Sequence, residues 1–167
     1  MTLSNRPKIS VFIATSIDGY IAKKNNDIDW LTKFSPPTDE NEDKDCGFSK
    51  FFSSVDVLVM DRNSYDVVSH FDPWPYEDKH VVVLSSTLTS VCKQAELFKG
   101  EITALFEKLQ AEDTKHIYIE GGATISQFLN MGLVDLCIPT LPKHQFRPHP
   151  NTDSGFIRTL IPETSER

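Results

Sequence analysis

The fold of this chain is decided by the stretch Ile117-Tyr118-Ile119-Glu120-Gly121-Gly122. Its apolar residues are typical of a buried strand, and we predict a strand over His116–Glu120. Residues Ala123–Met131 follow with helical spacing of their apolar side chains, and Gly132 stands where a glycine commonly ends a helix. Two glycines between a strand and a helix let another group approach the backbone, and free amides at a helix start attract phosphate. By itself, the pattern also fits a tight turn without a ligand.

Apolar strands and amphipathic helices alternate along the rest of the chain. The other predicted strands are Ile9–Ala14, Val55–Met60 and Val81–Leu84. The other predicted helices are Lys44–Ser54, a helix that begins at Arg62 and ends at Pro73, and a helix that includes Ile102–Leu109. Alternation of this kind favours a mainly parallel sheet with helices on both faces, so we predict an α/β fold with three layers.

Length and composition indicate one ordinary globular domain. A chain of 167 residues, 39% hydrophobic and 25% charged, is long enough for one substantial core, so residues 1–167 are predicted to form a single domain. No apolar run approaches the roughly 18 residues that cross a bilayer, and the first eight residues lack the apolar core of a signal peptide. Three scattered cysteines without C-x-x-C spacing fit a reducing compartment. We therefore expect a cytoplasmic protein without a membrane partner.

The net charge of −7 argues against nucleic acid as a partner, because phosphate backbones are bound by basic surfaces. A small anionic cofactor needs only a local pocket of donors and stays compatible with this charge. His144 and His149 are close in sequence, but no cysteine or carboxylate pattern completes a metal site around them. We interpret them as loop histidines and predict no metal.

Two further strands are followed by polar loops. Arg62-Asn63-Ser64 follows one predicted strand, and its guanidinium, hydroxyl and amides can bind phosphate. Ser85-Ser86-Thr87 follows the next strand and offers hydroxyl groups. Each loop has a simpler alternative, a helix-capping turn. Three polar loops at the ends of neighbouring strands nevertheless favour a ligand, because ligands collect at that edge of open α/β sheets.

The motifs together resemble one known group of proteins. They are Val11–Ala22 with its Asp18-Gly19 turn, Ile28–Leu31, Val57–Tyr65, Val83–Thr87 and Ile117–Ala123. In this order the chain resembles the dihydrofolate-reductase-like superfamily, in the group related to the C-terminal reductase domain of bacterial riboflavin-biosynthesis deaminase/reductases. The resemblance covers residues 9–135, about three quarters of the chain. It implies the dihydrofolate-reductase-like three-layer fold.

The resemblance also implies NADPH as the cofactor. The implied contacts to its phosphates are Arg62, Asn63 and Ser64, those to its 2′-phosphate are Ser85 and Ser86, and those to its pyrophosphate are Gly121, Gly122, Ala123 and Thr124. Ala14, Asp18 and Gly19 are implied to border the nicotinamide and the substrate. Glu120 would face the same cleft and bind or protonate the substrate. Asp18 can instead be only a turn former, and Glu120 only the partner of a local amide.

The implied activity is reduction of a small substrate at a C=O or C=N bond, as in 5-amino-6-(5-phosphoribosylamino)uracil reductase. The chain lacks the H-x-E…P-C-x-x-C signature of a zinc deaminase half. A non-catalytic nucleotide-binding relative is the alternative. Dihydrofolate reductase itself is less favoured, because no carboxylate on a matching early helix can be assigned to folate. Relatives often pair through sheet edges, which implies a homodimer.

The chain departs from the family pattern at two places. Asp61 stands where the family usually has glycine, and we expect its carboxylate to repel the cofactor and to crowd a tight turn. From Pro139 to Pro162 there are five prolines and no convincing pair of strands. A central strand is therefore not expected in the tail 139–167, and the C-terminal strands of the family are expected to be altered.

Overall fold

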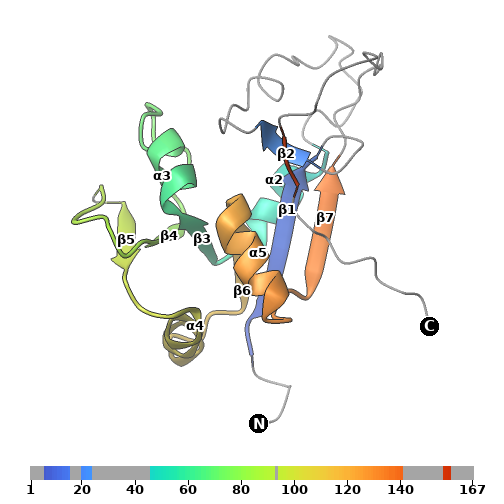
Figure 1. Ribbon diagram of the computed structural model, residues 1–167. Helices are drawn as coiled ribbons and strands as arrows, with labels where there is room; N and C mark the ends of the chain where they lie inside the picture. The colour runs from blue at the N-terminus through green and yellow to red at the C-terminus, as the bar shows by residue number, and fades with distance from the viewer. Residues whose placement is uncertain (1–5, 16–19, 24–45, 93, 141–155, 159–167) are drawn as a thin grey trace, which may run out of the picture.

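The computed structural model describes residues 6–15, 20–23, 46–92, 94–140 and 156–158 (Figure 1). The strands in these ranges are β1 (Lys8–Ala14), β2 (Tyr20–Lys23), β3 (Val57–Asp61), β4 (His80–Leu84), β5 (Ala95–Phe98), β6 (His116–Glu120), β7 (Leu136–Thr140) and β8 (Phe156–Arg158). The helices are α2 (Phe48–Ser53), α3 (Arg62–Val68), α4 (Ile102–Ala111) and α5 (Gly122–Asn130). None of these helices is long and apolar enough to span a bilayer.

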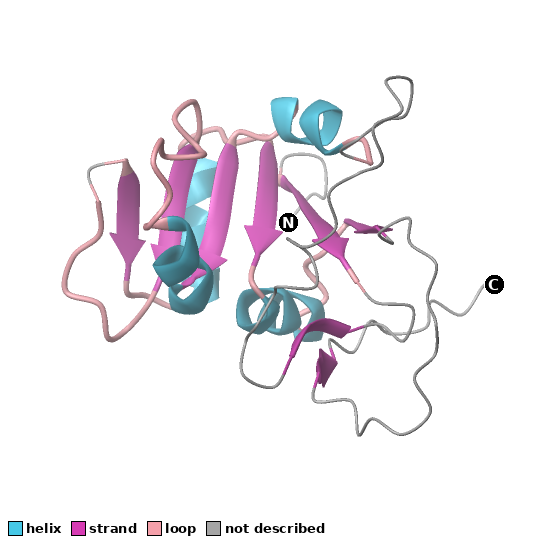
Figure 2. Cartoon of the chain, turned by 90° about the horizontal axis from the view of Figure 1, so that it is seen from above, coloured by secondary structure: helices cyan, strands magenta, loops and turns pink. Residues whose placement is uncertain are grey.

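The main sheet has six strands in the order β5-β4-β3-β6-β1-β7, and every neighbouring pair is parallel. Figure 2 shows these strands side by side, with the antiparallel pair β2-β8 lying apart from them. All carboxyl ends of the six strands therefore lie along one edge of the sheet. The predicted mainly parallel sheet is confirmed.

Helices cover both faces of the sheet, as strand β3 illustrates. Successive side chains of a strand point to opposite faces. Val57 and Val59 belong to an apolar cluster that contains buried residues of α4 and α5. Leu58 and Met60 belong to a second cluster, with buried residues of α2 and α3. The continuous apolar run of β3 is explained by this double burial, and the predicted three layers are confirmed.

The amino ends of the central strands are aligned by the carboxylate of the exposed Asp56 and by the ring of the buried His116. One Asp56 carboxylate oxygen accepts hydrogen bonds from the backbone N–H groups of Lys115 and His116, each at 2.9 Å. The His116 ring lies 2.8 Å from Ser10 Oγ through Nε2 and 2.9 Å from the Ser54 carbonyl oxygen through Nδ1. Because Ser10 and His116 are buried, this link holds β1, β6 and the end of α2 in one arrangement.

The expectation of no strand pair in the tail is wrong. β7 pairs with β1 from Ser10↔Leu136 to Ala14↔Thr140, and β8 pairs with β2. Pro139 is tolerated because β7 occupies an edge of the six-stranded sheet, where every second N–H points away from the neighbouring strand. The narrower expectation that the tail holds no central strand agrees with this edge position. Most of the tail lies outside the described residues.

The remaining differences from the predicted elements are local. β5 was not predicted, although it forms the other edge of the main sheet. The predicted helix Lys44–Ser54 corresponds to α2, which begins at Phe48, and the first two residues of the prediction lie outside the described ranges. The other predicted strands and helices are found within two residues of their expected ends, apart from the helix starting at Arg62, which ends at Val68.

Candidate functional site

The neighbouring strands β3 and β6 are followed by helices that pack on opposite faces of the sheet. β3 continues into α3, which packs on one face of the sheet, whereas β6 continues into α5 on the other face. Connections that leave adjacent parallel strands toward opposite faces open a crevice at the strands' carboxyl ends, and open α/β sheets bind ligands there. Asp61-Arg62 and Gly121-Gly122 border this crevice. Since β4 lies next to β3, the three predicted polar loops are neighbours in space.

Asp61 ends β3 at the crevice, and its side chain lies close to Gly121. Its backbone is extended, with φ −82° and ψ 172°, so the expectation that its side chain crowds a tight turn is wrong. Its Oδ1 accepts a hydrogen bond from the Ser64 N–H at 2.9 Å and caps α3. One amide that we expected to bind phosphate is therefore bonded to a carboxylate of the chain itself.

Gly121 has to be glycine at this position. Its φ of +89° is rarely adopted by residues with a side chain. A Cβ there would lie 2.5 Å from Asp61 Oδ2 and 2.6 Å from Ser64 Oγ. The pair of glycines thus permits a close approach, as predicted, and the approaching groups are the side chains of Asp61 and Ser64.

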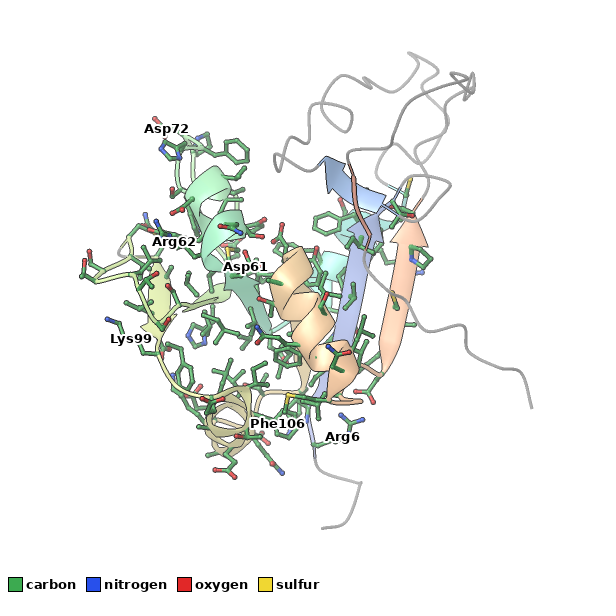
Figure 3. The ribbon with its side chains drawn as sticks, viewed as in Figure 1. Arg6, Asp61, Arg62, Asp72, Lys99 and Phe106 are labelled. Carbon is green, nitrogen blue, oxygen red and sulfur yellow. The ribbon has the colours of Figure 1, made fainter. Side chains whose placement is uncertain are left out.

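A cavity of about 650 Å³ opens beside the crevice, along the ends of β3, β4 and β5, the start of α4 and the side of α5 that carries Ala123, Gln127 and Asn130. This volume is in the range of small-molecule sites. The predicted residues that line it are Arg62, Asn63, Ser85, Ser86 and Ala123. Asp61, Thr87, Lys99 and Glu101 also line it. Figure 3 shows Asp61 and Arg62 near the start of α3 and Lys99 beside β5.

The polar wall of this cavity is held by short-range hydrogen bonds. Arg62 Nη1 donates to Thr87 Oγ1 at 3.2 Å, and Arg62 Nε lies 3.3 Å from Asp66 Oδ2. Ser85 Oγ accepts from the backbone N–H groups of Thr87 and Leu88, at 3.2 and 3.1 Å. The guanidinium is thereby oriented but remains about half exposed, and the Ser85 hydroxyl lies 3.3 Å from Thr87 Oγ1.

Glu120 ends β6 beside the crevice, and its carboxylate has a phenol as its partner. Tyr76 Oη donates to Glu120 Oε2 at 3.1 Å. The pKa of Glu120 is raised to about 7, mainly by burial; the Tyr76 hydrogen bond lowers this pKa and the charge of Asp61 raises it. A carboxyl group with this pKa exchanges a proton readily at neutral pH, which suits acid–base chemistry. In the part of the chain that the structure describes, the hydrogen-bond partner of this carboxylate is the Tyr76 hydroxyl and not a local amide.

Other predicted residues take different positions. Ala14 ends β1 beside β6 and pairs with Thr140 of β7. Thr124 is only 2% exposed, so it offers almost no surface to a ligand. Neither these two residues nor Ser64, Glu120, Gly121 and Gly122 line the 650 Å³ cavity. Asp18 and Gly19 lie outside the described residues.

Three residues of the site were not predicted from the sequence. Tyr76 lies in the proline-containing segment after α3, which has no periodic pattern, and it reaches a residue 44 positions away. Lys99 and Glu101 follow β5, a strand that the sequence analysis missed. In the sequence, the indication that Lys99 belongs to a loop at a helix start is its position before Gly100 and the amphipathic segment that forms α4.

Comparisons with known proteins agree with this architecture. In the solved structures, a putative riboflavin biosynthesis protein from Shewanella sp. PV-4 is 42% identical, with a TM-score of 0.70 over 80% of this chain and 76% of that chain. A deaminase/5-amino-6-(5-phosphoribosylamino)uracil reductase from Thermotoga maritima shares the fold, with a TM-score of 0.55 and 14% identity over 93% of this chain and 50% of that one.

Two proteins of Bacillus subtilis (strain 168) are similar in sequence. The uncharacterized protein YwjB is 32% identical over 137 residues, which span 80% of this chain and 75% of YwjB. The uncharacterized protein YyaP is 29% identical over 141 residues, spanning 77% and 70%. The family model of the RibD C-terminal domain matches residues 7–143. The resemblance seen in the sequence is thus confirmed, and the chain belongs to the RibD C-terminal domain family.

Proposed function

We propose that this chain is an NADPH-dependent reductase of the riboflavin-biosynthesis type, which transfers hydride to a C=O or C=N bond of a small substrate. One observation carries the proposal, the order of the strand ends. Along the carboxyl edge, Ala14 ends β1, Glu120 ends β6, Arg62 follows β3 and Ser85 follows β4. This order matches an extended dinucleotide with its nicotinamide near Ala14, its pyrophosphate near Gly121 and its adenosine phosphate near Ser85.

The residues present fit such a cofactor. The 650 Å³ cavity has a half-exposed guanidinium and a hydroxyl-rich loop on one wall, which suits a phosphorylated ribose. The start of the nine-residue helix α5 lies beside it, and Ala123 lines it. Bound NADPH would supply the hydride, and the protein would supply binding and orientation.

Glu120 supplies the proton in this proposal. Reduction of C=O or C=N adds one hydride to carbon and one proton to oxygen or nitrogen. With its pKa raised to about 7, Glu120 is roughly half protonated near neutral pH and can donate that proton. The Tyr76 hydroxyl then stabilises the carboxylate that remains, through its 3.1 Å hydrogen bond. Solvent returns the proton before the next turnover.

Family membership supports the riboflavin-type substrate class. The 42% identical Shewanella protein is described as a putative riboflavin biosynthesis protein. We therefore expect 5-amino-6-(5-phosphoribosylamino)uracil, or a small molecule with a similar carbonyl or imine group, as the substrate.

The test is oxidation of NADPH by the purified chain, measured with this phosphoribosylaminouracil and with a panel of small carbonyl and imine compounds. Glu120→Gln should lower turnover by about 10²- to 10⁴-fold, the usual contribution of a general acid. Glu112→Gln is the matched control, because Glu112 is an exposed glutamate at the end of α4. Failure of the wild-type chain both to bind and to oxidise NADPH would refute the proposal.

A nucleotide-binding relative without turnover is the second candidate, and the position of Asp61 favours it. A carboxylate beside Gly121 repels the phosphate that the crevice would receive. In that case the wild-type chain would bind NADPH weakly and oxidise none of it with any substrate, and Asp61→Gly would restore binding without activity.

A further inference from the structure

The neighbouring strands β1 and β6 part before they reach the carboxyl edge of the sheet. Their pairing ends at Ser10↔Tyr118. On its other side, β1 stays paired with β7 as far as Ala14, and β6 stays paired with β3 as far as Glu120. The ends of β1 and β6 thus separate from each other, although each strand remains paired with its other neighbour.

The carbonyl group of Phe12 points into the space where the two strands part. The backbone polar groups of a strand alternate between its two neighbours. The Lys8 N–H donates to the Lys115 carbonyl oxygen at the start of β6, so every second residue after Lys8, Phe12 included, faces β6. In a continued ladder the Phe12 carbonyl would accept from the Gly121 N–H. The β1-β6 pairing has ended before this point, and Gly121 leaves the extended conformation, with a φ of +89°.

The Tyr118 hydroxyl takes the place of that ladder donor. Tyr118 Oη donates to the Phe12 carbonyl oxygen at 3.0 Å. The buried Tyr118 ring lies edge-on to Phe51 of α2, with ring centroids 5.2 Å apart, and the Phe12 ring packs on the same phenylalanine at 5.1 Å. Burial raises the pKa of Tyr118 well above its ordinary value of 10, and the charges of Glu120 and Tyr76 raise it further. The hydroxyl therefore keeps its proton at neutral pH and can donate it to the carbonyl.

This bond lies directly below the two strand ends that the proposed reaction uses. Ala14 is two residues beyond Phe12, and Glu120 is two residues beyond Tyr118. In the proposed function Ala14 lies near the nicotinamide and Glu120 donates the proton. The hydride and the proton have to reach the same double bond, and a misplacement of about 1 Å can slow a reaction about 100-fold. The separation of the two strand ends thus matters for turnover.

We propose that Tyr118 is a positioning residue of the reductase site. Its hydroxyl links β1 to β6 across the point where they part, and it thereby sets the distance between Ala14 and Glu120. Tyr118 acts through these two residues, because its hydroxyl is bonded to the backbone and its ring is buried. The inference rests on the proposed function, because it assigns a residue to the same site.

The experiment compares the wild-type chain with Tyr118→Phe, which removes the hydroxyl and keeps the ring. Tyr65→Phe is the matched control, because Tyr65 belongs to the same apolar cluster and its hydroxyl is also bonded to the backbone, at the Cys92 N–H. Three properties are measured: native-state amide hydrogen exchange, the affinity for 2′,5′-ADP, and kcat and KM for NADPH with the compound that the wild-type chain reduces fastest. Thermal unfolding of each variant shows that it is folded.

We expect Tyr118→Phe to lower kcat about tenfold, because the loss of one hydrogen bond lets the strand ends shift by less than about 1 Å. The KM for NADPH and the affinity for 2′,5′-ADP should change less than about twofold, since the lost positioning acts on the reaction step. Amide exchange at residues 11–14 and 119–120 should be about tenfold faster. Tyr65→Phe should leave both kcat and this exchange unchanged. An unchanged kcat in Tyr118→Phe, or an equal fall in Tyr65→Phe, overturns the positioning role.

The outcomes separate this inference from the proposed function. If the wild-type chain oxidises NADPH and Tyr118→Phe keeps the same kcat, only the role of Tyr118 is wrong. If the wild-type chain oxidises no NADPH with any compound, the reductase function fails, and the positioning role fails with it. Faster exchange in Tyr118→Phe alone would then still show that the hydroxyl links the two strands, and equal exchange in both variants would refute that link as well.

Discussion

Replacement of Gly121 by alanine tests whether the crevice is as tightly built as the structure indicates. Two effects act on the variant. The φ of +89° at Gly121 strains a residue with a side chain, and the new Cβ would lie 2.5 Å from Asp61 Oδ2 and 2.6 Å from Ser64 Oγ. Contacts this short force both neighbours to move, because atoms of real side chains do not approach so closely.

The size of the effect follows from a second glycine. Gly132 also has a positive φ, of +66°, but a Cβ there would have no neighbour within 4 Å. Gly132→Ala should therefore show the effect of backbone strain alone. We expect the free energy of unfolding to fall by about 1 kcal/mol, because the lower entropy of the unfolded alanine chain offsets part of the strain. Gly121→Ala should lose about 3 kcal/mol, since overpacking adds roughly 1–3 kcal/mol.

Urea denaturation followed by circular dichroism measures both free energies of unfolding. The double variant Gly121→Ala/Asp61→Gly removes one of the two close contacts, so we expect the two substitutions to couple favourably by about 1 kcal/mol. Equal losses for Gly121→Ala and Gly132→Ala, without coupling to Asp61, would refute the close approach of Asp61 and Gly121.

Three further outcomes follow from the same geometry. Asp61→Gly should lower the free energy of unfolding by only a few tenths of a kcal/mol, because glycine replaces a helix cap at little cost. The variant should bind NADPH several-fold more tightly in a fluorescence titration. Weaker binding would mean that Asp61 helps to bind the phosphate. Wild-type turnover should fall as pH rises through about 7, because Glu120 must be protonated, and a pH profile without that limb would exclude Glu120 as the acid. Burial lowers the pKa of His116 below its ordinary value of 6.5, so the unfolded chain binds a proton at this histidine more readily than the folded chain does. The free energy of unfolding should accordingly fall as pH drops below about 6.5, and denaturation of wild type and His116→Gln at two pH values would show whether that slope depends on His116.

Local pattern was sufficient for the central layers of the fold. The runs Val57–Asp61 and Ile117–Glu120 are apolar at every position but the last, because both faces of these strands are covered by helices. β5 and β7 were not predicted from the sequence, because they are edge strands and lack the continuous apolar run of a central strand. β5 is four residues long with no buried residue, and β7 contains Pro139, which would break a central ladder.

By itself the sequence determined the alternation of elements, the three polar loops and the family, since all of these depend on residues close together in the chain. Tertiary structure decided which loops are neighbours and what each side chain meets there. Tyr76 reaches Glu120 from 44 residues away, and Asp61 reaches the backbone at Gly121 from 60 residues away. Lys99 comes beside Ser85 only through the register of β4 and β5. Two glycines after a strand therefore predict that another group lies close to the backbone there. The packing of α3 and α5 on opposite faces of the sheet determines that this group is the Asp61 side chain.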